Sequence, residues 1–299
     1  MMSTRDDPLV RPRETPRRLF YATGILLDAD DFTDEQTYHR GRLARALAYL
    51  HGHGTVAGLR VDWEAALAPG EDPDFPDGRE EQLLVQPGLA IDRIGRLIEL
   101  PRPACIRLDR WYQAQDAEAL RQGLHGTPVA GVTVGDGITI DEAVVVDLFV
   151  RFTVCEQGKT PAFAAGPYNA LDAVMPSRLQ DGYELELVIR TEADPPLPQP
   201  LWPDLAAVPP ADRAGALRAA ILQAWREGTA FTDLGGLTPL PEHALGQDPT
   251  ALFLARLLLP ATAAASPAPP IRGTQPVQVG NDARPLVYPS GALARWLGL

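Results

Sequence analysis

The sequence predicts an α+β fold: a β-rich sheet or sandwich covered by an N-terminal amphipathic helix, with a smaller mixed region toward the C-terminal end. Three observations predict it. Apolar residues recur at helical spacing between Phe32 and Leu50, and short alternating or continuous apolar segments typical of strands follow them. Prolines and glycines, 30 and 26 of 299 residues, fall mostly between these segments, as they do in chains with many turns.

The predicted helix begins at a group of three carboxylates, Asp28, Asp30 and Asp31. Carboxylates are favoured there because they accept hydrogen bonds from unpaired first-turn amides and lie at the positive end of the helix dipole. One stripe then runs along the helix at steps of three and four residues, formed by Phe32, Gln36, His39, Leu43, Leu47 and Leu50. We expect this stripe to pack on the sheet.

A glycine-rich turn follows the helix and leads into a strand. Gly52 or Gly54 is expected to take the left-handed conformation that ends a helix, and Gly58 stands where the strand passes beneath it. Apolar and polar residues alternate from Leu59 to Trp63, which is typical of a half-buried strand. We predict a tightly packed structural corner at Gly52, Gly54, Gly58 and Leu59.

Further strands are predicted from the apolar segments downstream, with an exposed Pro-, Gly- and Asp-rich loop from Ala68 to Gly78. Gly95 suits the tight turn between two of them, because the turn requires a positive φ. The run from Ala143 to Val154 is expected to be buried on both faces at the centre of the sheet. The remaining predicted elements are strands at 83–85, 89–91, 97–100, 104–108 and 183–189, a helix at 109–124, and an irregular connection at 156–179.

Composition predicts four regions: a flexible arm at residues 1–18, a main β-rich domain at 19–193, a Pro-rich linker at 194–210 and a smaller C-terminal α+β region at 211–299. The last region holds an expected helix at 211–227 that begins after two prolines. The apolar run from Ala251 to Leu259 fits a buried strand or a helix, and we favour the strand. Short strands at 275–279 and 285–288 and a helix at 290–297 complete it.

The formal net charge of −12 argues against nucleic acid or an anionic membrane as a partner, because both attract basic surfaces. The one basic cluster lies in the N-terminal arm, which is either disordered or ordered against a neighbouring subunit: Arg5, Arg11, Arg13, Arg17 and Arg18. Cys105 and Cys155 are expected to be buried free thiols. No signal-peptide or membrane-spanning run is seen, so we expect a cytoplasmic protein with no membrane insertion.

Two stretches resemble a known family. They are Tyr21-x-x-Gly24-x-Leu26-Leu27 through Leu50-His51-Gly52-x-Gly54-x-Val56-x-Gly58-Leu59-x-Val61, with Asp31-Phe32 and Glu35-Gln36-x-Tyr38 between, and Pro87-Gly88-Leu89-Ala90-Ile91-Asp92-x-x-Gly95-Arg96-x-Ile98. They are similar to a poorly characterised bacterial family encoded beside contractile injection systems and other phage-tail-like particles. The resemblance extends from about residue 19 to 109. It departs at His53 and Ala57, where that family usually has Trp and Cys.

The resemblance implies a structural role in a particle, and that family has no catalytic motif to transfer. We therefore expect a non-enzymatic virion-like component of a phage-tail-like contractile injection particle, at the baseplate or a terminal cap, assembled in the cytoplasm and without a cofactor. Its expected partners are other baseplate, tube or sheath subunits and copies of itself. Candidate interface residues are Arg17 and Arg18 of the arm and Trp202 of the linker, since arginine and tryptophan often anchor protein contacts.

The alternative hypothesis is a soluble metal-dependent hydrolase that uses the His51 and His53 region. Two histidines two residues apart on an extended segment face the same side and can share a metal, with His39 or the Asp28 to Asp31 carboxylates completing the site. Against this, His51 suits a helix end, where it bonds terminal carbonyls, and His53 replaces a packing residue. The glycines of the corner follow a helix and precede a strand, the wrong order for a phosphate-binding loop.

Overall fold

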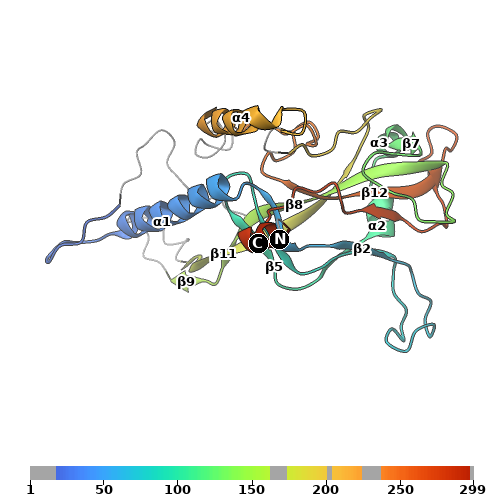
Figure 1. Cartoon of the computed structure of the whole chain (residues 1–299). Coiled ribbons are helices and arrows are strands. Elements are labelled where there is room, and N and C mark those ends of the chain that lie inside the picture. Colours follow the sequence, from blue (N-terminus) through green and yellow to red (C-terminus); the bar gives the residue numbers. More distant parts are fainter. Residues whose placement is uncertain (1–17, 162–173, 201–203, 224–236, 297–299) are drawn as a thin grey trace.

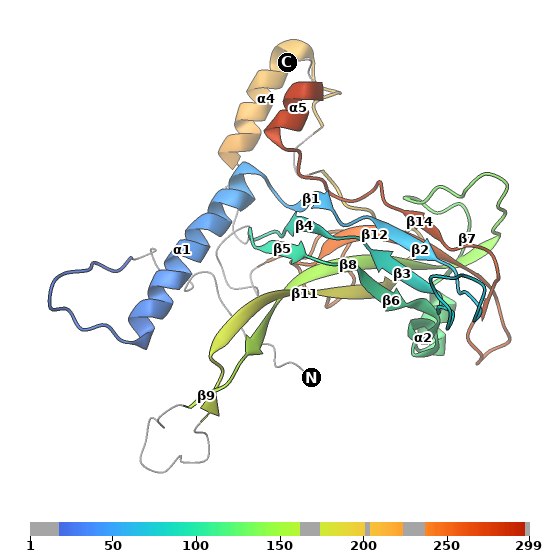
Figure 2. The same ribbon diagram turned by 90° about the horizontal axis from the view of Figure 1, so that it is seen from below.

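The computed structural model describes residues 18–161, 174–200, 204–223 and 237–296. The protein has an α+β fold with β-rich, open, antiparallel sheets, which confirms the predicted fold class. Figure 1 shows a sheet-based body, with the longest helix and a two-stranded ribbon both leading away from it. Figure 2 shows the short strands of one layer lying across the long strands of the other.

The first layer is a three-stranded antiparallel meander that is bent in the middle. On one side of the bend the strand order is β1-β4-β5, and on the other it is β2-β3-β6. The strands predicted at 83–85, 89–91, 97–100 and 104–108 are confirmed, whereas the strand predicted from Leu59 to Trp63 begins only at Val61 and is preceded by a separate strand before the bend. The six strands are β1 (Gly54–Gly58), β2 (Val61–Glu64), β3 (Gln82–Val85), β4 (Gly88–Ile91), β5 (Leu97–Leu100) and β6 (Ala104–Arg107).

The second layer contains the longest strands. β8 (Glu142–Gln157) lies between β11 (Arg178–Ile189) and β12 (Leu252–Thr262), which confirms the predicted central position of β8. The strand that we favoured at residues 251–259 is also confirmed. Five shorter strands are found in the described residues: β7 (Leu124–Gly126) pairs with β8, β13 (Ile271–Arg272) and β14 (Gln278–Gly280) pair with β12, and β9 (Thr160–Pro161) and β10 (Val174–Met175) pair with each other.

The main hydrophobic core lies between the two layers. Leu83 and Ile98 of the meander and Leu148 and Leu257 of the long strands are fully buried there. Burial of a leucine or isoleucine side chain contributes roughly 1.5–3 kcal/mol. The other face of β8 is covered as well, because loop residues around Val132 and Ile138 pack on Val145 and others pack on Phe149. This explains the continuous apolar run that predicted burial on both faces.

The helices lie at the periphery. α2 (Leu108–Gln113) and α3 (Ala117–Gln122) replace the single helix predicted at 109–124, because Asp116 caps a second helix start with bonds to the amides of Glu118 and Ala119. α1 (Ala29–Leu50) begins at Asp28, as predicted, with a reciprocal capping box between Asp28 and Asp31. α4 (Pro210–Gln223) and α5 (Ser290–Trp296) match the two helices predicted near the C-terminal end.

The prediction that the apolar stripe of α1 packs on the sheet is wrong. Only Gly41 and Ala44 of this helix are buried, whereas Phe32, Leu43 and Leu50 are 52%, 57% and 77% exposed. At 3.6 residues per turn, Gly41 lies about 160° around the helix axis from Leu43. The helix therefore meets the body most closely at its small residues, while Leu47 of the stripe is half-buried and its other apolar residues are exposed. The helix leads away from the sheets in both views (Figures 1 and 2).

The boundary predicted near residue 195 does not divide the chain into two parts with separate sheets. β12 lies beside β8 in the central sheet, so residues of the predicted C-terminal region complete the main β-structure. The predicted linker does not stand free either: Pro195 is buried, and the carbonyls of Pro195 and Pro196 accept hydrogen bonds from Arg256 at 2.9 and 3.0 Å. Prolines lack an N–H but keep a carbonyl acceptor, and here the sheet supplies the donor.

Two other predictions are modified. The irregular connection expected at 156–179 is shorter than predicted, because β8 continues to Gln157 and β11 begins at Arg178; residues 162–173 lie outside the described part. In place of a strand at 285–288, residues around Leu286 form one parallel bridge with Thr55. Cys105 is exposed and Cys155 half-buried, so the expectation of two buried thiols is wrong.

Candidate functional site

The structural corner lies where the chain leaves α1 and enters the meander. Gly52, Gly54 and Gly58 have positive φ angles of 77°, 135° and 65°. A Cβ on Gly58 would lie 2.0 Å from the carbonyl oxygen of Pro87, and one on Gly54 would lie 2.5 Å from that of Pro285. The corner is therefore held by direct backbone contact with two other segments, which no side chain at these positions would permit.

The bend itself carries an unusual backbone conformation at Leu59. This residue has a φ of 56°, rare for a branched side chain, and its side chain is completely buried. Its amide donates to the carbonyl of Pro87 at 3.2 Å, and its carbonyl accepts from Nη1 of Arg284 at 2.6 Å. The side chain of Asn281 pairs with both backbone groups of Val61 at 3.0 Å. The segment from Asn281 to Arg284 thus satisfies the polar groups that the bend leaves free.

The turn between β4 and β5 lies within the second stretch that carries the family resemblance, from Pro87 to Ile98. The carboxylate of Asp92 is fully buried; it accepts from the amides of Ile94 and Arg96 and from Nε of Arg96 at 2.6 Å. Nη2 of Arg96 donates to Thr250, and its guanidinium lies 4.6 Å from the ring centre of Phe152. Gly95, with a φ of 90°, takes the conformation predicted for it. The motif residues therefore organise a turn and its contacts.

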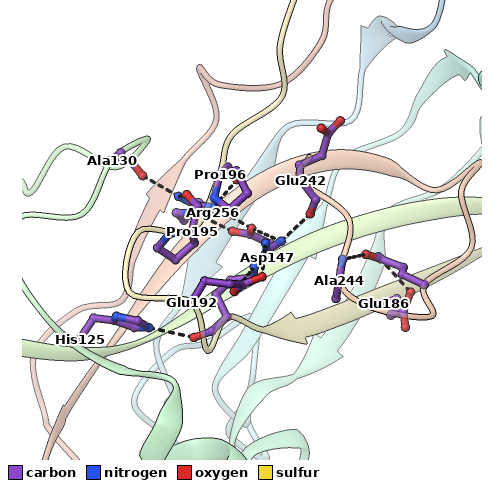
Figure 3. A network of polar contacts seen from close by, with 12 residues as sticks. His125, Ala130, Asp147, Glu186, Glu192, Pro195, Pro196, Glu242, Ala244 and Arg256 are labelled. Atoms are coloured by element: carbon purple, nitrogen blue, oxygen red, sulfur yellow. Dashed lines mark hydrogen bonds and ion pairs between the residues drawn. The ribbon is translucent and has the colours of Figure 1, made fainter. Parts of the chain in front are cut away.

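A buried ionic network joins the three long strands (Figure 3). Asp147 of β8 and Arg256 of β12 are register partners, and Asp147 accepts from Nε and Nη2 of Arg256 at 2.7 and 2.9 Å. Arg190, just beyond β11, donates to Asp147 at 3.1 Å and to Glu192 at 2.8 and 3.1 Å. The side chains of Asp147, Arg190 and Arg256 are all fully buried.

The network also fastens loops onto the sheet. Besides Pro195 and Pro196, Arg256 donates to the carbonyl of Ala130 at 3.1 Å, and Arg190 donates to the carbonyl of Glu242. His125 bonds the carbonyl of Arg190 at 2.9 Å (Figure 3). Every guanidinium bond ends on a carboxylate or a carbonyl, which is how buried charges are made tolerable in an interior. The arrangement is that of a structural clamp.

A second group of ionisable residues includes His53, which follows the end of α1. His53 is 9% exposed, and burial, reinforced by the nearby charges of Arg93 and His243, lowers its pKa to about 4. His243 accepts from the amide of Leu240 at Nδ1 and bonds the carbonyl of Ala251 at Nε2, so its Nε2 carries the proton. Burial lowers the pKa of His243 and raises that of Glu242. The interior therefore favours the uncharged forms of all three side chains.

His51 and His53 contribute to one pocket of about 500 Å³. The rest of its lining is mostly apolar and includes Pro198, Pro285, Leu286 and Tyr288. Within the described ranges, no three His, Cys, Asp or Glu side chains are arranged to hold a metal ion. The hypothesis of a metal site at His51 and His53 thus has two candidate ligands in one pocket, and the described residues supply no third. His39, the other histidine considered, lies on α1 with its imidazole 70% exposed.

Large apolar side chains are exposed at the end of the molecule that carries α1. Phe20 and Leu26, in the segment before the helix, are 82% and 93% exposed, and Phe32, Leu43 and Leu50 of α1 are exposed as well. α4 and α5 add Leu222 at 84% and Trp296 at 84%. We call the set on the first segment and helix the α1 surface; it comprises Phe20, Tyr21, Ile25, Leu26, Phe32, Leu43 and Leu50.

The predicted interface residues are placed only in part. Arg18 is exposed, while Arg17 and Trp202 lie outside the described residues. Sequence reasoning missed Asp147, Arg190 and Arg256. The signal was available for two of them, because Arg256 is the single charged residue of β12, Asp147 is the single charged residue in the apolar run from Ala143 to Val150, and a buried charge requires a partner.

Comparison with known proteins adds no identification: no protein-family model matches the chain, and no curated protein does. Among the helices in the described ranges, none combines the length and the apolar character needed to cross a bilayer.

Proposed function

We propose that this protein is a non-enzymatic structural or assembly component of a phage-tail-like contractile injection particle, at the baseplate or a terminal cap. It acts through protein–protein contacts with neighbouring subunits, including copies of itself. The observation that carries the proposal is the α1 surface: a long helix and the segment before it carry large apolar side chains that their own fold leaves exposed.

The geometry of α1 favours a partner over the protein's own core. The helix has 22 residues, which corresponds to a length of about 33 Å, and Gly41 and Ala44 are its only buried residues. Contiguous exposed apolar patches are uncommon on monomers and mark interaction sites. Covering this surface is favourable by roughly 25 cal/mol per Å² of apolar area, so a neighbouring subunit that covers it gains affinity there.

The positions that carry the family resemblance support a scaffold role. Gly58 and Gly88 make the close backbone approach at the bend, where a Cβ on Gly88 would lie 2.3 Å from the carbonyl of Ala57. Asp92 and Arg96 are paired within the β4–β5 turn, and Gly95 of the same turn lies against the backbone of α1. These residues serve backbone geometry at the bend and at the turn that contacts α1, which fits a scaffold that holds the helix.

The test is incorporation into particles. We would replace Phe32 and Leu43 together by glutamate, because both are exposed and the charges oppose burial at an interface. Circular dichroism and the melting temperature should stay unchanged, while the amount of the protein in purified particles should fall at least about ten-fold, the effect of losing about 1.4 kcal/mol of affinity.

The matched control is Thr33→Glu, which adds one carboxylate at an exposed position about 100° around the helix from Phe32. This variant should be incorporated normally. Normal incorporation of the Phe32→Glu, Leu43→Glu protein would remove the α1 surface from the assembly interface and the proposal with it.

A further inference from the structure

No strand in the described part of the chain pairs with the outer edge of β11. In the described part of the chain, the backbone hydrogen bonds of Arg178–Ile189 are made only with β8. In an antiparallel pair alternate residues direct their N–H and C=O groups away from the partner, so about half of these 12 residues present unused groups. An unpaired edge of this kind is a template for another strand.

The side chains of β11 are also incompletely covered on that side. Tyr183, Leu185 and Leu187 pack on the main core but remain half-buried. Their register partners on β8, from Leu148 to Phe152, are almost completely buried on the same face. The difference follows from position, because β8 has a neighbour on both sides and β11 has one.

The opposite face of β11 is acidic. Glu184 is exposed and bonds Arg151 of β8 at 2.6 Å, and Glu186 accepts from Gln247 at 3.3 Å. Arg151 also lies 3.6 Å from Asp248, so one arginine is shared by two carboxylates. The local balance on this face is therefore negative, beside a chain that already carries a net charge of −12.

We infer that the β11 edge binds a β-strand from a different protein subunit, one that alternates apolar and basic residues. Its apolar side chains would extend the inner face beside Tyr183, Leu185 and Leu187, and its basic side chains would face Glu184 and Glu186. Cross-strand pairs of opposite charge and of apolar residues are the units that stabilise neighbouring strands. Main-chain bonds to the edge supply the rest, as in β-strand addition to other open sheets.

A second copy of β11 is a poorer occupant. Antiparallel pairing of two β11 strands about residue 184, 185 or 186 places Glu184 or Glu186 directly opposite another glutamate. Like charges directly opposite each other destabilise a strand pair. These three registers are thus disfavoured for two copies, and a basic strand avoids this conflict.

The inference concerns a different element from the α1 surface and does not depend on the particle assignment. The probe is a capped synthetic peptide of about ten residues that alternates valine and arginine, the length of a typical strand. Two comparison peptides alternate valine and glutamate, or hold the same valines and arginines in two separate blocks. Fluorescence anisotropy gives their affinities for the full chain, and hydrogen exchange locates them.

We expect the alternating basic peptide to bind at least about ten-fold more tightly than either comparison peptide, and to protect amides of residues 183–189 from exchange. Glu184→Arg, Glu186→Arg should reverse the preference toward the acidic peptide. The matched control is Glu99→Arg, which changes the charge of an exposed carboxylate on β5 and should leave the preference unchanged.

Three results would overturn the inference: equal affinity for the alternating and the block basic peptides, protection outside β11, or a preference that does not reverse in the double variant. A fourth would be protection of residues 183–189 that rises with protein concentration in the absence of peptide, since this would identify a second copy as the occupant. Failure of the peptide to bind at all would also overturn it.

Discussion

Gly95 and Ala44 meet in direct backbone contact: a Cβ on Gly95 would lie 1.8 Å from the carbonyl oxygen of Ala44. The β4–β5 turn thus packs against Ala44, one of the two buried residues of α1. This pair is therefore one of the points at which the body holds the helix.

Gly95→Ala should therefore weaken the attachment of α1. The substitution combines a positive φ of 90° with a steric clash, and together these should lower the free energy of unfolding by about 2–4 kcal/mol. Chemical denaturation measures the change, and amide exchange in residues 41–50 should rise with it.

Gly246→Ala is the matched control for that substitution. Gly246 has a φ of 80°, but an added Cβ would meet no atom within 4 Å. This substitution should lower the free energy of unfolding only by the backbone strain, about 1 kcal/mol, and should leave amide exchange in α1 unchanged. Equal losses in the two variants would show that contact with Ala44 contributes nothing.

The second prediction concerns the buried network. Asp147→Asn removes the only carboxylate that contacts both Arg190 and Arg256 in the described residues, and both guanidinium groups are fully buried. Breaking such a network by removing one partner leaves an uncompensated buried charge, so the free energy of unfolding should fall by about 3–5 kcal/mol.

Glu184→Gln provides the comparison, because it breaks an exposed ion pair on the same strands at a similar distance, 2.6 Å. Exposed pairs contribute about 0–1 kcal/mol. If denaturation gave equal effects for the two substitutions, the network would not be the clamp described above.

The third prediction is that Gly58→Val destabilises the bend. A Cβ at Gly58 would lie 2.0 Å from the carbonyl oxygen of Pro87, and the φ of 65° is strained for a branched residue. The expected loss is at least about 2 kcal/mol, from strain and overpacking. Gly70→Val, with a φ of 80° and open space around it, isolates the strain alone. An unchanged melting temperature in Gly58→Val would mean that the bend yields easily.

Local chemistry predicted the local structure well. The cap at Asp28, the turn glycine at Gly95 and the doubly buried run of β8 follow from residue properties alone, because hydrogen-bonding side chains, positive φ and apolar periodicity act over a few residues. The placement of β12 beside β8 depends on a pairing of residues 109 positions apart, Asp147 and Arg256. No local pattern in the sequence indicates which residues of two such distant strands lie opposite each other.

The direction of α1 was not predictable for a different reason. An apolar stripe shows that a helix has a face to bury, but it does not say whether the partner is the same chain or another one. The small residues Gly41 and Ala44 form a second contact face that periodicity does not reveal. Likewise, Pro195 and Pro196 indicate an extended segment, and only the structure shows that Arg256 binds its carbonyls.

The last prediction concerns acid stability and rests on His53. Its pKa in the folded protein is about 4, below the ordinary 6.5, because burial and the neighbouring charges of Arg93 and His243 disfavour the imidazolium. Between these values the unfolded chain binds more protons than the folded one, so stability falls as the pH falls from 6.5 to 4.

The expected loss from His53 across this range is about 3 kcal/mol, from about 2.5 pH units at 1.36 kcal/mol each. The lowered pKa of His243 acts in the same direction, while the raised pKa of Glu242 acts in the opposite one, because its folded form holds the proton to higher pH. A single pH profile therefore mixes several groups, and a difference between two proteins is needed.

We would measure urea unfolding of the natural protein and of His53→Phe at several pH values between 7 and 4. The phenyl ring keeps an aromatic side chain at a buried position and cannot take up a proton, so the variant should lose less stability on acidification, with a gap that widens by about 3 kcal/mol toward pH 4. His39→Gln, which removes an exposed imidazole on α1, is the control and should follow the natural protein. Parallel profiles for the natural protein and His53→Phe would show that His53 is protonated as readily in the folded chain as in the unfolded one, and would place the source of any acid sensitivity in another group.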